Sequence, residues 1–144
     1  MKKVFAILCA VMVVLSTISV PAFAVEHEEK IIDLGDGFYV VESTTRSPLQ
    51  RSEDTVSGGK TDRIYYDSTL IGTVTLYAMF DISGSTAKAI DAFITGSGSN
   101  GATYTRGTTS YSGNVATGTA YFKYSGVEKI LRISISCSSS GVLS

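Results

Sequence analysis

The sequence predicts an all-β protein, folded as an antiparallel β-sandwich of about seven strands, with a small closed β-barrel as the alternative. Three observations support this prediction. Thr, Tyr, Val and Ile are abundant after residue 62, apolar and polar residues alternate with a period of two, and Gly/Ser clusters recur at strand-like spacing. One segment, Thr86 to Ile94, is open to a second interpretation. A helix capped by Ser85 or Thr86 would bury its apolar residues, but we expect a strand there.

The N-terminal residues have the pattern of a secretory signal peptide. Two lysines precede the apolar run 4–20, and the sequence PAFA that follows ends in the small-x-small pattern that signal peptidase accepts. We expect a helical signal peptide over residues 1–24, cleavage before Val25, and secretion to the extracellular medium. An uncleaved membrane anchor is the alternative.

Removal of residues 1–24 leaves 120 residues, enough for one domain with an ordinary core. Within residues 25–61 we expect a hairpin followed by a polar linker. Lys30 to Leu34 and Phe38 to Ser43 are strand-like runs separated by the turn sequence Gly-Asp-Gly. The following residues, 44–62, are so poor in apolar side chains that they predict a long loop.

Residues 62–144 are expected to form the core β-sandwich domain. The length of the predicted loop leaves two alternatives for the hairpin that precedes it. Either the hairpin docks on the main sheet, or residues 25–51 are a separable segment, which processing near Arg46 or Arg51 would release.

Charge and cysteine content narrow the function classes. Loss of the two leader lysines leaves ten basic against thirteen acidic residues, which argues against a nucleic-acid or anionic-membrane partner, because both require a basic surface. Cys9 lies in the leader, so Cys137 alone remains and no intramolecular disulfide can form.

A repeated pattern, T-x-T-x-Y followed by Phe and Ser-Gly, predicts two related hairpins. The first copy covers Thr73 to Gly84 and the second covers Thr117 to Gly126. Side chains alternate between the two faces of a strand, so each copy has an inward row and an outward row. The inward rows are Leu70, Val74, Leu76, Ala78, Phe80 and Ile82 in the first copy, and Ala116, Gly118, Ala120, Phe122 and Tyr124 in the second. The outward residues form the candidate binding face: Thr73, Thr75, Tyr77, Thr117, Thr119 and Tyr121.

These outward hydroxyls and tyrosines have two interpretations. They could form a platform for hydrogen bonding and stacking on a glycan or a protein, or they could be ordinary residues of a solvated strand face. In the last strand, Leu131, Ile133 and Ile135 alternate with polar residues and Cys137 continues the apolar row. Cys137 is therefore predicted to be a buried thiol, with an intermolecular disulfide or a reactive thiol as alternatives.

Catalytic constellations are missing, so we expect no enzyme. The only histidine, His27, lies in the charged N-terminal segment, which excludes a Ser-His-Asp or Cys-His arrangement in the core and leaves a zinc site with too few ligands. We expect the carboxylates Asp62, Asp67, Asp81, Asp91 and Glu128 to lie near turns or on outward faces. Calcium at Asp67, Asp81 and Asp91 is a weak alternative without a D-x-D-x-D-G loop, and we expect neither a metal nor a cofactor.

The leader, the G-T-x-T-x-Y strand at Gly72 to Tyr77, and the late stretch from ATGTAYFKYSG to ISISC resemble a family of small secreted β-rich proteins. These are uncharacterised proteins of Gram-positive, clostridia-like bacteria, and the resemblance covers chiefly Asp62 to Ser144. It implies a signal peptide followed by a compact β domain, and it brings no functional residues. In size and composition the chain is also similar to small secreted β-sandwich bacteriocins, but it lacks their Trp and His residues.

The sequence thus predicts a secreted, non-catalytic binding or interaction module, monomeric or weakly oligomeric. Its partner would be a cell-surface, glycan or protein ligand, with no nucleic acid and no membrane association after cleavage. A secreted antimicrobial or toxin-like β domain is the alternative function.

Overall fold

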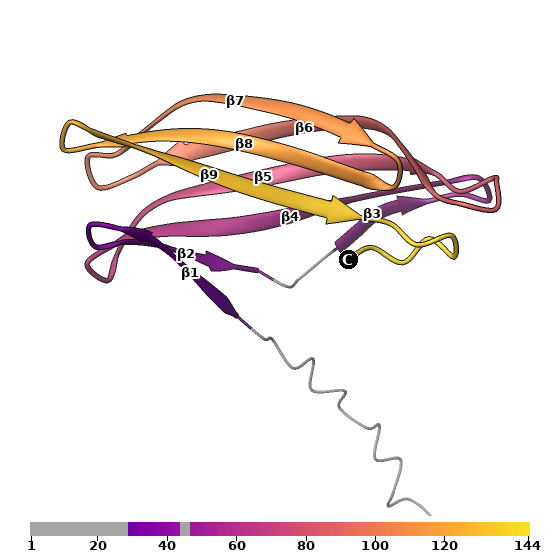
Figure 1. Ribbon diagram of the computed structural model, residues 1–144, viewed down its shortest axis with the longest axis horizontal. Coiled ribbons are helices and arrows are strands. Elements are labelled where there is room, and N and C mark those ends of the chain that lie inside the picture. Colours follow the sequence, from indigo (N-terminus) through magenta and orange to yellow (C-terminus); the bar gives the residue numbers. More distant parts are fainter. Residues whose placement is uncertain (1–28, 44–46) are drawn as a thin grey trace, which may run out of the picture.

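The protein is a two-layer β-sandwich (Figure 1). The computed structural model describes residues 29–43 and 47–144, so the predicted signal peptide lies outside the described residues. The described part contains nine strands. They are β1 (Lys30–Gly35), β2 (Phe38–Glu42), β3 (Ser47–Arg51), β4 (Thr55–Tyr66), β5 (Thr69–Asp81), β6 (Lys88–Gly98), β7 (Thr103–Ser112), β8 (Val115–Tyr124) and β9 (Val127–Ser136).

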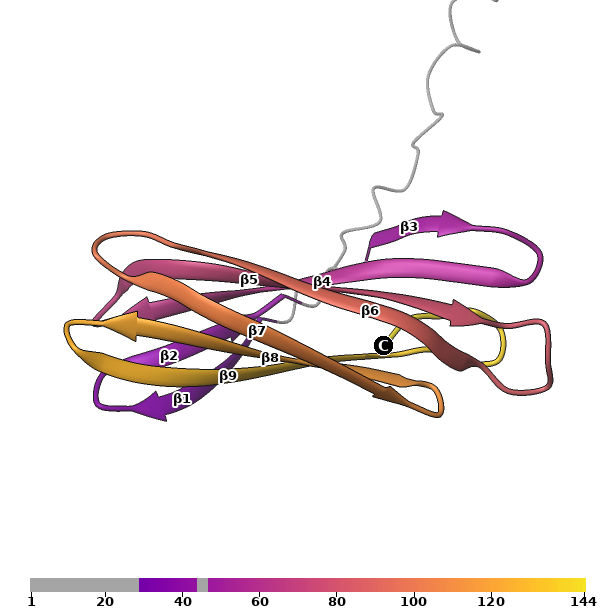
Figure 2. The ribbon, with the colours of Figure 1, turned by 90° about the horizontal axis from the view of Figure 1, so that it is seen from above.

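The strands form two antiparallel sheets. One has six strands, in the order β1-β2-β4-β5-β6 with β3 paired to β4, and the other has three, in the order β7-β8-β9 (Figures 1 and 2). The all-β antiparallel sandwich is therefore confirmed, and the closed barrel is not the fold. The described part has nine strands where about seven were expected. No helix of those residues is long and apolar enough to cross a membrane.

The predicted N-terminal hairpin is confirmed and is part of the larger sheet. Strands β1 and β2 pair around a turn in which Gly35, Asp36 and Gly37 all have positive φ values, a conformation that the Gly-Asp-Gly sequence tolerates. Strand β2 then pairs with the second half of β4, from Asp62 to Tyr66. Of the two alternatives for the hairpin, the structure shows the docked one.

The long loop predicted for residues 44–62 is wrong. Strand β3 lies within it, and β4 begins at Thr55 and crosses the predicted boundary between residues 61 and 62. The prediction failed because this half of β4 is polar and contains two glycines. Its strand conformation comes from pairing with β5 on one edge and β3 on the other.

The core between the sheets confirms most of the predicted alternation. Val74, Leu76, Ala78 and Phe80 are all buried on β5. Leu70 is an exception at 37% exposure, because a β-bulge opposite Ile64 and Tyr65 adds one residue to β5 and turns Ile71 inward in its place. The buried residues form two clusters, one around Phe80 and Ile135 and the other around Phe122 and Val40, and Ile94 packs against both.

The strand predicted over Thr86 to Ile94 is confirmed as β6 from Lys88 onward, and no helix forms. The Ser-Gly turns also form as predicted. The first connects β5 to β6, and the second connects β8 to β9 with positive φ at Ser125 and Gly126.

Cys137 is buried at 1% exposure and packs in the cluster around Phe80, as predicted. Its thiol donates a hydrogen bond to the carbonyl oxygen of Ser138 at 3.4 Å. We expect the native protein to react with a thiol reagent at least 100-fold more slowly than the urea-unfolded protein, because local opening must precede modification. Mass spectrometry of the labelled protein measures this rate, and equally fast labelling in both states would contradict the buried position.

Candidate binding face

The outer face of the six-stranded sheet carries the first predicted row. Over residues 57–65, 73–79 and 91–97, side chains at odd positions of β4, β5 and β6 point away from the core, so register places Gly59, Tyr77 and Phe93 in one line across three strands. The adjacent line contains Thr61, Thr75 and Thr95. Thr73, Thr75 and Tyr77 are therefore brought together on one face.

Tyr77 and Phe93 form a stacked aromatic pair on this face. Their ring centroids are 4.6 Å apart and their planes differ by 17°. A Cβ atom at position 59 would lie 3.1 Å from the Tyr77 ring, so this ring packs closely over Gly59. Phe93 remains 55% exposed, which leaves an apolar aromatic surface open to solvent.

A shallow groove of about 230 Å³ runs beside this pair. Its floor is the main chain of Gly58, Ala78 and Ala92. The side chains of the two alanines point toward the core and Gly58 has none, so the floor is nearly flat. The other lining residues are Ser57, Tyr77, Met79, Asp91 and Phe93. The groove therefore combines apolar walls with a hydroxyl and a carboxylate at one end.

Hydroxyl groups continue the face beyond the aromatic pair. The side-chain oxygens of Thr61 and Thr75 are 2.8 Å apart, and those of Thr73 and Ser97 are 2.9 Å apart. In each pair one hydroxyl donates to the other. Each pair therefore keeps one O–H donor and several acceptor lone pairs for a ligand.

A second stacked pair, Tyr39 and Tyr65, lies on the same outer face where β2 meets β4. Its ring centroids are 5.1 Å apart and its planes differ by 5°. Tyr65 is six residues beyond Gly59 on β4, which corresponds to about 20 Å along the strand. The hydroxyl pairs lie between the two aromatic pairs.

The second predicted row lies elsewhere. Thr117, Thr119 and Tyr121 are half-buried on β8, on the outer face of the three-stranded sheet. Arg106 covers Tyr121, with its guanidinium carbon 4.1 Å from the ring centroid. The outer faces of a sandwich point in opposite directions, so the structure does not bring the six predicted residues into one site.

Sequence reasoning missed Phe93 and Tyr39 as members of this face, whereas alternation along the first copy already places Met79 on the outward side. Phe93 is the most exposed of the stacked residues, and its position follows from alternation once β6 is a strand, because Ala92 and Ile94 take the inward positions. The helix alternative for residues 86–94 obscured that alternation. Tyr65 is a candidate stacking residue from its type alone, but its stacking on Tyr39 follows only from the pairing of β2 with β4.

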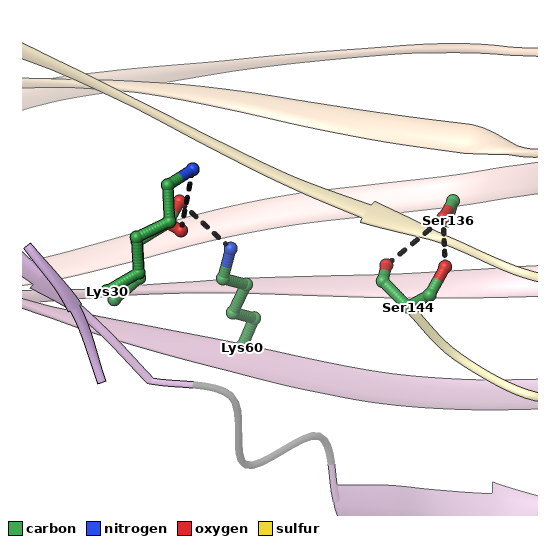
Figure 3. A network of polar contacts seen from close by, with 5 residues as sticks. Lys30, Lys60, Ser136 and Ser144 are labelled. Carbon is green, nitrogen blue, oxygen red and sulfur yellow. Dashed lines mark hydrogen bonds and ion pairs between the residues drawn. The ribbon is translucent and has the colours of Figure 1, made fainter. Parts of the chain in front are cut away.

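The prediction that Asp62 lies near a turn or on an outward face is wrong. It is 0% exposed on the inner face of β4, directly opposite Glu42 of β2. The pKa of Asp62 is raised to about 6: burial is the largest cause, the Glu42 carboxylate also raises it, and Lys60 and the backbone N–H of Ser43 act in the opposite direction. Lys60 and Lys30 both form ion pairs with Glu42, at 3.2 Å and 3.6 Å (Figure 3).

The other candidate carboxylates are dispersed. Asp67 and Asp81 lie at opposite ends of β5, and Asp91 is exposed beside the groove. The Ser83 hydroxyl and N–H donate to Asp81 and lower its pKa. In the part of the chain that the structure describes, no three His, Cys, Asp or Glu side chains are grouped to hold a metal ion.

Comparison of the chain with protein-family models, with curated proteins and with solved structures found no match, so the face must be interpreted from its own chemistry.

Proposed function

We propose that this is a secreted, non-catalytic binding module whose ligand lies on the outer face of the six-stranded sheet. The observation that carries the proposal is the stacked pair of Tyr77 and Phe93 beside a groove whose floor is bare main chain. Exposed aromatic rings on a rigid sheet are costly to leave in water, and a ligand that covers them gains their burial. Secretion is supported by the signal-peptide pattern of residues 1–24.

The chemistry of the face favours a glycan chain of a cell surface as the ligand. The C–H face of a sugar ring packs on an aromatic ring, and its hydroxyls need both donors and acceptors. The face offers aromatic surface at Phe93 and paired hydroxyls at Thr61 and Thr75. A shallow, open groove suits an extended chain better than a small molecule, which needs an enclosed site.

Replacing Phe93 with alanine is expected to weaken binding about tenfold, which corresponds to loss of one aromatic contact of about 1.4 kcal/mol. Purified protein is added to washed Gram-positive cells and to cell walls freed of protein, and the bound fraction is measured against concentration. Viability of the cells is recorded in the same samples.

Tyr111→Ala is the matched control, because Tyr111 is 51% exposed on β7 of the other sheet. Its binding curve is expected to coincide with that of the unmodified protein. Equal binding by Phe93→Ala and the unmodified protein would exclude this face as the binding site. Binding to cells but not to protein-free walls would indicate that the ligand is a protein and not a glycan. Killing without saturable binding would favour the antimicrobial alternative.

A further inference from the structure

Asp62 occupies an unusual position for a carboxylate. Its side chain lies on the inner face of the larger sheet, in line with the buried residues Val56 and Ile64 of the same strand. The backbone N–H of Ser43 interacts with the Asp62 carboxylate and lowers its pKa, but no described residue donates a hydrogen bond of normal geometry to either oxygen. A buried polar group without such bonds is costly, and for a carboxylate the cost is far larger when it is ionised.

Among the described residues, Lys60 is the cation that acts on Asp62. Glu42 faces it from β2 and Lys60 from its own strand, while its register partner on β5, Val74, is apolar. The Lys60 ammonium is already paired with Glu42 at 3.2 Å. Lys30 of β1 pairs with the other oxygen of Glu42, but its side chain is 70% exposed. Among the residues that the structure describes around Asp62, Lys60 therefore serves both carboxylates.

The strand pairing beside Asp62 ends abruptly. Glu42 and Asp62 are the last pair between β2 and β4, and the pairing of β3 with β4 begins only at Gly59. Within residues 29–43 and 47–144, Lys60 and Thr61 have no strand partner on that edge, although β5 pairs with them on the other. Separation of β2 from β4 can therefore begin at the Glu42 end and admit water there.

We propose that ionisation of Asp62 opens the Glu42 end of the β2–β4 pairing, so that the β1–β2 hairpin is tightly held in mild acid and loosened at neutral pH. The inference is independent of the glycan ligand. The opening also affects the outer face, because the stacking of Tyr39 on Tyr65 depends on the pairing of β2 with β4.

Proton linkage gives the direction in which opening of the β2–β4 pairing changes with pH. In the closed structure the pKa of Asp62 is raised to about 6, whereas in an opened, hydrated end it returns toward 3.8. The closed form therefore holds its proton more strongly. The stabilisation of the closed form by this proton is complete below pH 3.8 and is lost as pH rises through 6. With these two values, the opening equilibrium increases about tenfold between pH 5 and pH 7.5.

Hydrogen exchange of the full secreted chain tests this inference. The opening equilibrium of the β2 amides, corrected for the intrinsic pH dependence of exchange, is compared with that of the β8 amides at pH 5 and pH 7.5. We expect about a tenfold increase in β2 and none in β8. In Asp62→Asn, which cannot ionise, we expect the β2 increase to disappear.

Asp54→Asn is the matched control, because Asp54 is exposed and the same isosteric change there should leave the tenfold increase intact. Carboxyl carbon NMR of the unmodified protein gives a second test that does not require a variant to fold. A midpoint near 6 for Asp62 supports the inference. A midpoint at or below 4, or the same pH dependence in β2 with and without Asp62→Asn, overturns it.

Discussion

Replacing Phe122 with alanine is expected to lower the free energy of unfolding by about 4 kcal/mol. Phe122 is 2% exposed, and its ring fills the space that glycine leaves at position 72, where a Cβ atom would lie 2.6 Å from it. The same ring packs on Tyr104 with centroids 5.5 Å apart. Its removal leaves a cavity between the two sheets, and urea denaturation followed by circular dichroism measures the loss.

Phe93→Ala is the control of equal size on the outer face. Because Phe93 is 55% exposed and only its stacking on Tyr77 is lost, the expected cost is about 1 kcal/mol. Similar losses in the two variants would contradict the assignment of Phe122 to the core and of Phe93 to the surface.

Replacing Gly98 with alanine is expected to cost about 3 kcal/mol. Gly98 is the last residue of β6, where the chain leaves the six-stranded sheet for β7 of the other sheet. A Cβ atom there would lie 2.6 Å from the carbonyl carbon of Ala102 and 2.9 Å from the Cα atom of Thr103. These are backbone atoms, so the turn itself must move, and urea denaturation measures the consequence.

Gly84→Ala is the control for this prediction. Gly84 lies in the turn between β5 and β6, where the nearest atom to a new Cβ atom would be 3.8 Å away. The variant is expected to have a free energy of unfolding within about 0.5 kcal/mol of the unmodified protein. If Gly98→Ala were equally harmless, the turn would be more adaptable than its close contacts indicate.

Alternation of residue types was sufficient to predict the fold class and most of the core. Val74, Leu76 and Phe80 of β5 lie where a period of two places them. So do Leu131, Ile133 and Ile135 of β9, and Cys137 just after it. It failed at Leu70, because a bulge changes which residues face inward and depends on the partner strand rather than on local sequence. It failed again in the first half of β4, where pairing on both edges forms a strand from polar residues.

The candidate face was predictable only in part. Thr73, Thr75 and Tyr77 lie on it as expected, but Phe93 joins them through pairing between strands, and the second row on β8 faces the opposite direction. Asp62 could not be recognised from the sequence, since a charged residue among polar neighbours predicts a solvated position. Only the pairing of β2 with β4 shows that its alternation places it inside.

The separation of inward and outward rows along β4, β5 and β6 has a consequence for how such a protein can change over generations. Tyr77, Phe93 and the threonines beside them can be replaced with small effects on the packing of Leu76, Ile94 and their neighbours. Mutation can therefore change the chemistry of the outer surface while selection for folding acts on the inner one. The uncovered side of the larger sheet offers a broad area for such divergence.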